Sequence, residues 1–204
     1  MKIFNLKRKY KNFELDIEML ELKDKQINCL IGDNGSGKST LLKAIIKDEN
    51  TISSKTLMLQ KPYIFKATVQ ENLEIIKKLT KSEIDIIEIS QKLNLFELLK
   101  QQALTLSGGQ KQRLAFAMSI ISDRDLILLD EPFNNVDLKS LNLMLSLLEN
   151  LDKTILLVSH KILLSKKIGE HFILIENGKL NLTGNKEEFF NQDNKTISLM
   201  IEME

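Results

Sequence analysis

A glycine-rich turn, Gly32 to Ser39 (GDNGSGKS), constrains the fold of this 204-residue chain more than any other feature. It follows the short, mostly apolar run Gln26–Ile31 and precedes Ser39–Lys47, whose pattern is helical. Every fixed position fits G-x-x-x-x-G-K-[ST], in which backbone N–H groups wrap around phosphate oxygens at a helix N-terminus. This strand, turn and helix predict a phosphate-binding loop, with Lys38 reaching the β- and γ-phosphates and Ser39 ligating Mg²⁺.

Composition excludes several classes of protein. The chain has 29 Lys and Arg against 28 Asp and Glu, so its net charge of +1 gives no general reason to bind nucleic acid. It has one cysteine, Cys29, so an internal disulfide cannot form and a reducing compartment is expected. No apolar run approaches the roughly 18 residues needed to span a bilayer, and the N-terminus lacks a signal-peptide pattern.

The first two thirds of the chain change from strand-like to helical patterns. Phe13–Met19 alternates apolar and charged residues, as a half-buried strand does, and Thr56–Gln60 resembles another short strand. Helix-spaced apolar residues then fill Thr68–Lys100. Within this stretch Ser82 and Asp85 have the spacing of a capping box, so a helix is expected to begin there.

The last third predicts the core of a parallel sheet. Leu126–Leu129 and Thr154–Val158 are continuous apolar runs, typical of strands buried on both faces, and Lys139–Asn150 between them is helical. Asn177 and Gly178 form a strong hairpin-turn signal between two further strands. The expected architecture is therefore α/β, with a helical insertion between an early strand and the core strands.

Two further motifs predict chemistry. Asp130 and Glu131 follow a buried strand, and the carboxyl ends of parallel strands face the ligand crevice of such sheets. Asp130 is placed to hold the Mg²⁺ shell, and Glu131 is placed to polarise an attacking water. Leu106 to Gln110 (LSGGQ) begins a helix, where Ser107 can cap and the glycines expose N–H groups to a second anion.

Together these three motifs resemble the signature of the ATP-binding cassette (ABC) ATPases, and the resemblance covers nearly the whole chain in order. Gln60 matches the glutamine of the family's Q-loop, Asp137 matches the D-loop aspartate, and His160 matches the switch histidine. The implied fold is α/β, a P-loop NTPase of the ABC ATPase type. It has a mixed sheet core, a small antiparallel β-lobe and an inserted helical subdomain.

The resemblance implies a full set of site residues. The ATP-binding residues of one subunit are Tyr10, Gly32, Asp33, Asn34, Gly35, Ser36, Gly37, Lys38, Ser39 and Thr40. The second subunit would supply Leu106, Ser107, Gly108, Gly109 and Gln110 to the same ATP, and Asp137 would contact across the dimer. The catalytic residues would be Glu131, His160 and Gln60, and the metal ligands Ser39, Gln60 and Asp130. Tyr10 is the expected aromatic that stacks on adenine, with Phe13 as its rival.

The chain also departs from the family's pattern. Residues 1–204 are expected to form one domain, with 1–66 and 103–204 as the core and β-lobe and about 67–102 as the helical subdomain. The segment between Lys38 and Gln60 is shorter than is usual in the family, so the β-lobe is expected to be trimmed. The D-loop carries Asn134 and Asn135 where the family commonly has Ser and Ala, but it keeps Asp137.

The resemblance implies an ATPase that uses ATP and Mg²⁺ and works as a homodimer. Its partners would be a membrane permease on a separate chain and a solute-binding protein, and its place the cytoplasmic face of the membrane. No nucleic-acid partner is expected. Faint similarities indicate an importer of an oxyanion such as tungstate or molybdate. The alternatives are a soluble ABC ATPase acting in translation or on DNA, and a docking subunit that does not hydrolyse ATP; the intact Lys38, Asp130, Glu131 and His160 argue against the latter.

Overall fold

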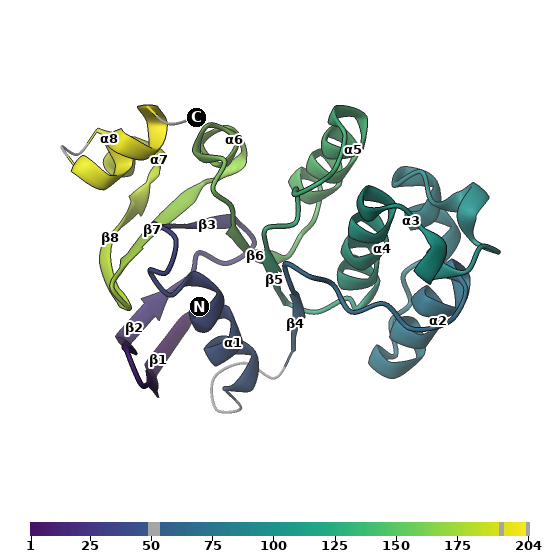
Figure 1. The fold of residues 1–204 in the computed structure, drawn as a ribbon, viewed down its shortest axis with the longest axis horizontal. Coiled ribbons are helices and arrows are strands. Elements are labelled where there is room, and N and C mark those ends of the chain that lie inside the picture. Colours follow the sequence, from purple (N-terminus) through teal and green to yellow (C-terminus); the bar gives the residue numbers. More distant parts are fainter. Residues whose placement is uncertain (49–53, 192–193, 203–204) are drawn as a thin grey trace.

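The computed structural model describes residues 1–48, 54–191 and 194–202. A six-stranded sheet with the order β4-β5-β6-β3-β7-β8 lies at its centre (Figure 1). Neighbouring strands are parallel, except that β8 runs antiparallel to β7. The strands of this sheet are β3 (Ile27–Ile31), β4 (Lys55–Met58), β5 (Leu126–Asp130), β6 (Thr154–Val158), β7 (His171–Glu176) and β8 (Lys179–Asn185). The structure therefore confirms the predicted α/β fold with a mixed sheet.

A separate antiparallel pair forms the small β-lobe. It consists of β1 (Lys2–Tyr10) and β2 (Phe13–Glu21), paired from Lys2 opposite Glu21 to Tyr10 opposite Phe13. Their inward positions, among them Ile3 and Leu15, are fully buried, while the charged positions between them face outward. This sheet has only these two strands among the residues described, which confirms the expected small lobe.

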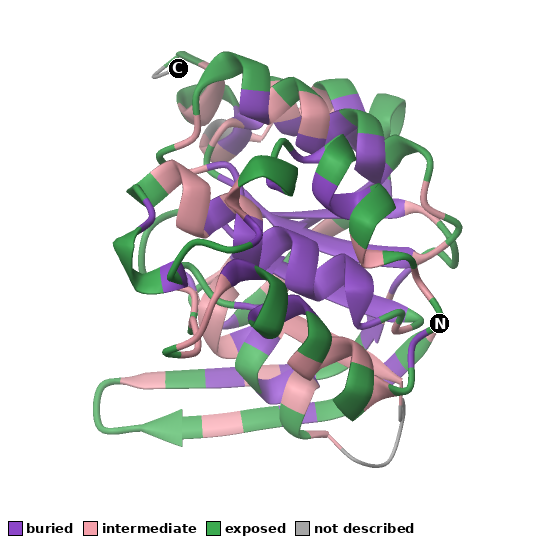
Figure 2. Ribbon diagram, turned by 90° about the vertical axis from the view of Figure 1, so that its right-hand side faces the viewer, coloured by how far each residue is buried: buried purple, intermediate pink, exposed green. Residues whose placement is uncertain are grey.

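Two apolar layers hold the central sheet, one on each face. Leu126 and Leu128 of β5 pack toward the β1–β2 pair and α1 (Lys38–Lys47). Ile127 and Leu129 point to the other face, which is covered by helices from the second half of the chain. Figure 2 shows buried positions running through the middle of the molecule, with exposed positions at its rim. Strands covered on both faces explain why these runs are apolar without alternation.

The remaining helices follow the sheet strands in the chain. They are α2 (Val69–Thr80), α3 (Ile86–Lys92), α4 (Gly108–Ile121), α5 (Leu138–Glu149), α6 (Ile162–Ile168), α7 (Lys186–Phe190) and α8 (Lys195–Glu202), with short 3₁₀ turns at Phe96–Leu98 and Ala103–Thr105. Helices α2 and α3 lie on the far side of α4 from the sheet (Figure 1). Helix α4 is therefore buried nearly all round, which removes the one-sided apolar stripe expected of a surface helix. No helix among the described residues has both the length and the apolar character required to cross a bilayer.

The position at which a helix begins in this middle region differs from one prediction. Ser82 was expected to cap a helix with Asp85, but α3 begins after Asp85, whose side chain accepts a bond from the Ile87 N–H at 2.8 Å. The Ser82 hydroxyl instead accepts the Ile84 N–H at 3.1 Å within a turn. A true capping box starts α2, where Thr68 and Glu71 bond each other's backbone N–H groups.

Candidate functional site

The glycine-rich turn joins the carboxyl end of β3 to the start of α1. Gly37, the residue before α1, has φ 111°, a left-handed conformation that glycine adopts without steric cost. It offers no side chain to cap the helix, and the first turn of α1 contains no acidic residue. The first N–H groups of α1 are therefore free to bind an anion, which fits a nucleotide phosphate.

Lys38 lies across this turn. Its ammonium donates to the carbonyl oxygens of Gly32 at 2.6 Å and Asp33 at 2.8 Å. Burial lowers the pKa of Lys38, while the nearby carboxylates of Glu131 and Asp130 oppose that shift. The positive charge of Lys38 is thus held at the turn where a phosphate would need it.

Asp130 is the last residue of β5 and lies beside the start of α1. Its carboxylate accepts a hydrogen bond from the Ser39 hydroxyl. Burial raises the pKa of Asp130, and the bond from Ser39 and the charge of Lys43 oppose this shift. One hydroxyl and one carboxylate suit Mg²⁺, which takes oxygen ligands and relies on substrate phosphates and water for the rest. In the described part of the chain, no cluster of three acidic, histidine or cysteine side chains could hold a metal by itself.

Glu131 and His160 face each other across the ends of β5 and β6. His160 Nδ1 lies 2.8 Å from Glu131 Oε1, an ion pair if the imidazole is protonated. Burial raises the pKa of Glu131 to about 7, and the neighbouring Asp130 adds to this. Burial also lowers the pKa of His160, followed by the charges of Lys38 and Lys161. A carboxyl group with a pKa near neutrality is suited to exchange a proton during catalysis.

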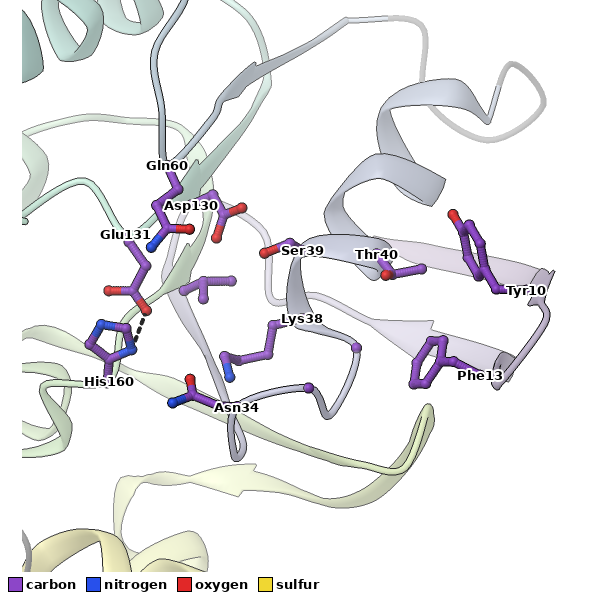
Figure 3. A pocket seen from close by; sticks show the side chains of 13 residues that line it. Tyr10, Phe13, Asn34, Lys38, Ser39, Thr40, Gln60, Asp130, Glu131 and His160 are labelled. Carbon is purple, nitrogen blue, oxygen red and sulfur yellow. Dashed lines mark ion pairs between the residues drawn. The ribbon is translucent and has the colours of Figure 1, made fainter.

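These residues line one cavity of about 380 Å³. Its lining consists of Tyr10, Phe13, Asn34, Gly35, Gly37, Lys38, Ser39, Thr40, Gln60, Asp130, Glu131, Val158 and His160. Figure 3 shows the two aromatic rings at one end, and Gln60 with the acidic pair and His160 at the other. The cavity thus has an aromatic end, a cationic middle and an acidic end, which suits a nucleotide triphosphate.

The base end of the cavity contains both aromatic candidates. The rings of Tyr10 and Phe13 lie 6.5 Å apart at 41°, so either could stack on a base. Gln60 lines the opposite end, but it lies two residues beyond β4 rather than within the predicted strand. Gly32, Asp33 and Ser36 do not line the cavity; the first two serve as acceptors for Lys38.

The other predicted residues lie outside this cavity. Ser107 and Gln110 form a capping box at the start of α4, and Asp137 caps α5 by accepting bonds from Ser140. None of the residues 106–110 lines the cavity, and the Leu106 side chain packs in the core. A single subunit therefore does not bring the LSGGQ segment to the phosphate turn.

One contact of the site was missed by the sequence analysis. Gln112 on α4 donates from Nε2 to the backbone oxygen of Glu131 at 3.1 Å. It stands between Lys111 and Arg113, so the local sequence resembles an exposed polar segment. No periodicity could reveal its burial because α4 is covered on nearly all sides.

The family profile described as "ABC transporter" matches residues 15–134, more than half of the chain. The chain belongs to the ABC transporter family. The molybdenum import ATP-binding protein ModC of Pseudomonas aeruginosa is 31% identical over 87% of this chain. The molybdate/tungstate import ATP-binding protein WtpC of Methanocaldococcus jannaschii is 30% identical over 97% of it. The chain spans 58% of the first relative's length and 75% of the second's.

The fold is also that of the family. A solved structure of an ATP-binding subunit of an ABC transporter superposes with a TM-score of 0.82, covering 99% of this chain and 98% of its own at 18% identity. ATP-binding subunits of the family are ATPases that use Mg²⁺ and whose hydrolysis is coupled to transport.

Proposed function

We propose that this ABC protein is the ATP-hydrolysing subunit of a membrane transporter and acts as a dimer. The observation that carries the proposal is the convergence of Lys38, Asp130, Glu131 and His160 on one cavity at the carboxyl ends of β3, β5 and β6. Each of these residues has the chemical type that phosphoryl transfer to water requires. The superposition of a solved ATP-binding subunit over 99% of this chain supports the same class of protein.

The proposed chemistry uses the two ends of the cavity. The phosphate turn with Lys38 binds the triphosphate, and Tyr10 stacks on the base. Glu131 accepts the proton of the attacking water, and His160 contacts the γ-phosphate and orients Glu131. Bound Mg²⁺ would be held by Ser39, Asp130 and Gln60 and would polarise the phosphate oxygens.

The proposed dimer completes the site. In a single subunit the Ser107–Gln110 segment lies away from the cavity at the N-terminus of α4. Head-to-tail packing of two copies would place these N–H groups on the ATP bound by the other copy, with Asp137 at the interface. The γ-phosphate would then favour the closed dimer, and hydrolysis of ATP would remove that contact and let the dimer open.

A groove beside the helical region is the proposed permease contact. This region is the helical subdomain, which we propose to comprise about residues 67–102, with residues 1–66 and 103–204 as the core. Between β4, α2 and α4 lies a groove of about 320 Å³, lined by residues that include Leu59, Tyr63, Phe65 and Met118. Tyr63 is 72% exposed there, and a large exposed aromatic residue in a groove is typical of a surface that binds another protein.

The transported solute is proposed from the names of the relatives. Both are import proteins for molybdenum or molybdate/tungstate, so we infer import of a small oxyanion with the help of a solute-binding protein. The subunit would act at the inner face of the cell membrane, held there by its permease. A permease gene and a solute-binding-protein gene beside the coding sequence would support this.

The variant Glu131→Gln tests the proposed hydrolysis and dimer together. Gln keeps the size of the side chain but cannot accept the proton, so hydrolysis should fall by about 100-fold or more. With Mg²⁺ and ATP the variant should elute as a dimer in size-exclusion chromatography, because the γ-phosphate is no longer removed. Without nucleotide it should elute as a monomer.

Lys38→Ala is the matched control for this experiment. It should elute as a monomer even with ATP, because the triphosphate loses its cationic contact. If Glu131→Gln remained monomeric with ATP and hydrolysed it at the wild-type rate, the proposed role of Glu131 and the proposed ATP-bound dimer would be wrong.

A further inference from the structure

The backbone of Glu131 has an unusual conformation. Its φ is 52°, in the left-handed region that residues other than glycine rarely adopt. Its N–H donates to the Val158 oxygen at 3.0 Å, which extends the pairing of β5 with β6 by one residue. Such a conformation persists where neighbouring groups fix the peptide on both sides.

The carbonyl side of this peptide is fixed by a side chain from α4. The Glu131 oxygen accepts the Asn134 N–H at 3.3 Å within a turn, and it accepts the Gln112 amide at the shorter distance of 3.1 Å. Gln112 is 5% exposed and does not line the nucleotide cavity. Its amide therefore does not contact the nucleotide, and the Glu131 peptide is the partner that satisfies it.

The position of Gln112 is itself fixed by close packing of α4 on the same loop. A Cβ atom added to Gly109 would lie 2.8 Å from the carbonyl oxygen of Asn135, so α4 and this loop are in direct backbone contact. Gln112 stands almost one helical turn further along α4. The close contact of helix and loop thus places Gln112 within hydrogen-bond distance of the Glu131 carbonyl.

We propose that Gln112 is a positioning residue for ATP hydrolysis, because its amide holds the Glu131 peptide in the left-handed conformation that aims the carboxylate into the cavity. This inference rests on the proposed role of Glu131 as the general base. The left-handed conformation brings the Glu131 carboxylate within 2.8 Å of His160 Nδ1. Without the amide, the carbonyl keeps the weaker 3.3 Å turn bond, and the peptide can relax toward an ordinary conformation.

The test is the variant Gln112→Met in the 204-residue chain, with ATP and Mg²⁺ as the ligands. Met has similar length but no donor, so kcat should fall by about tenfold or more while KM and the equilibrium Kd for ATP change less than about twofold. Gln112→Leu is a second variant, since its side chain has no donor for the carbonyl. It should lower kcat in the same way if Gln112→Met does not fold.

Thr154→Val is the matched control. It removes a buried hydroxyl that accepts the Lys25 N–H at 3.0 Å, at the opposite end of the sheet from the cavity. Its kcat should stay within about twofold of the wild type. A similar fall in kcat for Gln112→Met and for Thr154→Val would overturn the positioning role. So would a rise in KM with unchanged kcat for Gln112→Met.

The variant Glu131→Gln separates this inference from the proposed function. If Glu131→Gln is inactive and Gln112→Met has the wild-type kcat, Gln112 is not a positioning residue and the proposed function stands. If Glu131→Gln keeps the wild-type kcat, Glu131 is not the base, and both its proposed role and the positioning role of Gln112 are wrong.

Discussion

At the scale of single residues, Lys38 shows how the site is prepared for an anion. Its ammonium donates to the carbonyl oxygens of Gly32 and Asp33, so it is held over the turn by its own backbone. A carbonyl is a weaker partner for an ammonium than a phosphate oxygen, because only the latter is charged. Binding of a triphosphate would therefore replace these bonds at a net gain.

The variant Lys38→Ala should weaken ATP binding by about 10- to 100-fold, which corresponds to the roughly 1.5–3 kcal/mol of a charged hydrogen bond. Isothermal titration with Mg²⁺ and ATP measures this directly. Lys47→Ala is the control, since Lys47 is exposed in the last turn of the same helix. Equal affinities for Lys38→Ala and the wild type would contradict the placement of the triphosphate.

The sequence predicts residues that act through their chemical type better than those that act through their position. Lys38 and Ser39 stand in a motif with fixed spacing, and Glu131 follows an apolar run, so the cavity they line could be predicted. Gln112 has no such signal, since only the packing of α4 shows that it is buried. Ser82 was misassigned because the choice between two capping residues depends on the local turn.

At the scale of secondary-structure elements, the β7–β8 hairpin supports the phosphate turn. The N–H of Gly178, at the tip of the hairpin, donates to the Ser36 oxygen at 2.9 Å. The Gly178 oxygen accepts the Asp16 N–H of β2 at 2.9 Å. The hairpin itself could be predicted from Asn177 and Gly178, but these contacts join segments far apart in the sequence and needed the folded structure.

The variant Gly178→Ala should destabilise the fold by about 2–4 kcal/mol, from the positive φ and the crowding together. Gly178 has φ 76°, and a Cβ there would lie 2.0 Å from the Glu14 oxygen. Urea unfolding measures the difference. Gly108→Ala is the control, because its Cβ would meet no atom within 4 Å and its stability should change by less than about 0.5 kcal/mol.

At the scale of the whole molecule, the two ends of the central sheet have different chemistry. The carboxyl ends of β3, β5 and β6 carry the cavity that we propose for the nucleotide. At the opposite end the buried Asn28 oxygen accepts the Lys23 N–H at 2.8 Å and lies 3.0 Å from His171 Nδ1. Because the Asn28 oxygen is an acceptor, His171 Nδ1 carries the proton of a neutral imidazole.

This buried histidine should make the stability depend on pH. Burial lowers the pKa of His171, followed by the charge of Lys23, while Glu21 and Glu188 oppose the shift. His171 therefore binds more protons in the unfolded chain than in the folded one once the pH falls below about 6.5, so its contribution to the free energy of unfolding should fall with decreasing pH. Glu131 contributes in the opposite direction, because its raised pKa lets the folded chain hold a proton that the unfolded chain has lost. Relative to the wild type, His171→Gln should keep more of its stability as the pH falls below about 6.5, and an identical pH dependence of the two proteins would show that His171 titrates normally.

The proposed mechanism depends on an ATP shared between two copies of the chain. The phosphate turn and the LSGGQ segment lie apart in one subunit, so neither copy alone would have a complete site. Two variants can each remove one half of that site. Lys38→Ala removes the turn's cation, and Ser107→Arg blocks the N-terminus of α4 with a bulky side chain.

The most direct measurement is the ATPase rate of these two variants, first separately and then mixed. Each alone should be nearly inactive, because any site that two of its copies could form has one defective half. In a mixed dimer one site combines two intact halves, so mixing should restore a rate well above that of either variant. A mixture no more active than its separate components, although mixed dimers form, would contradict the shared site.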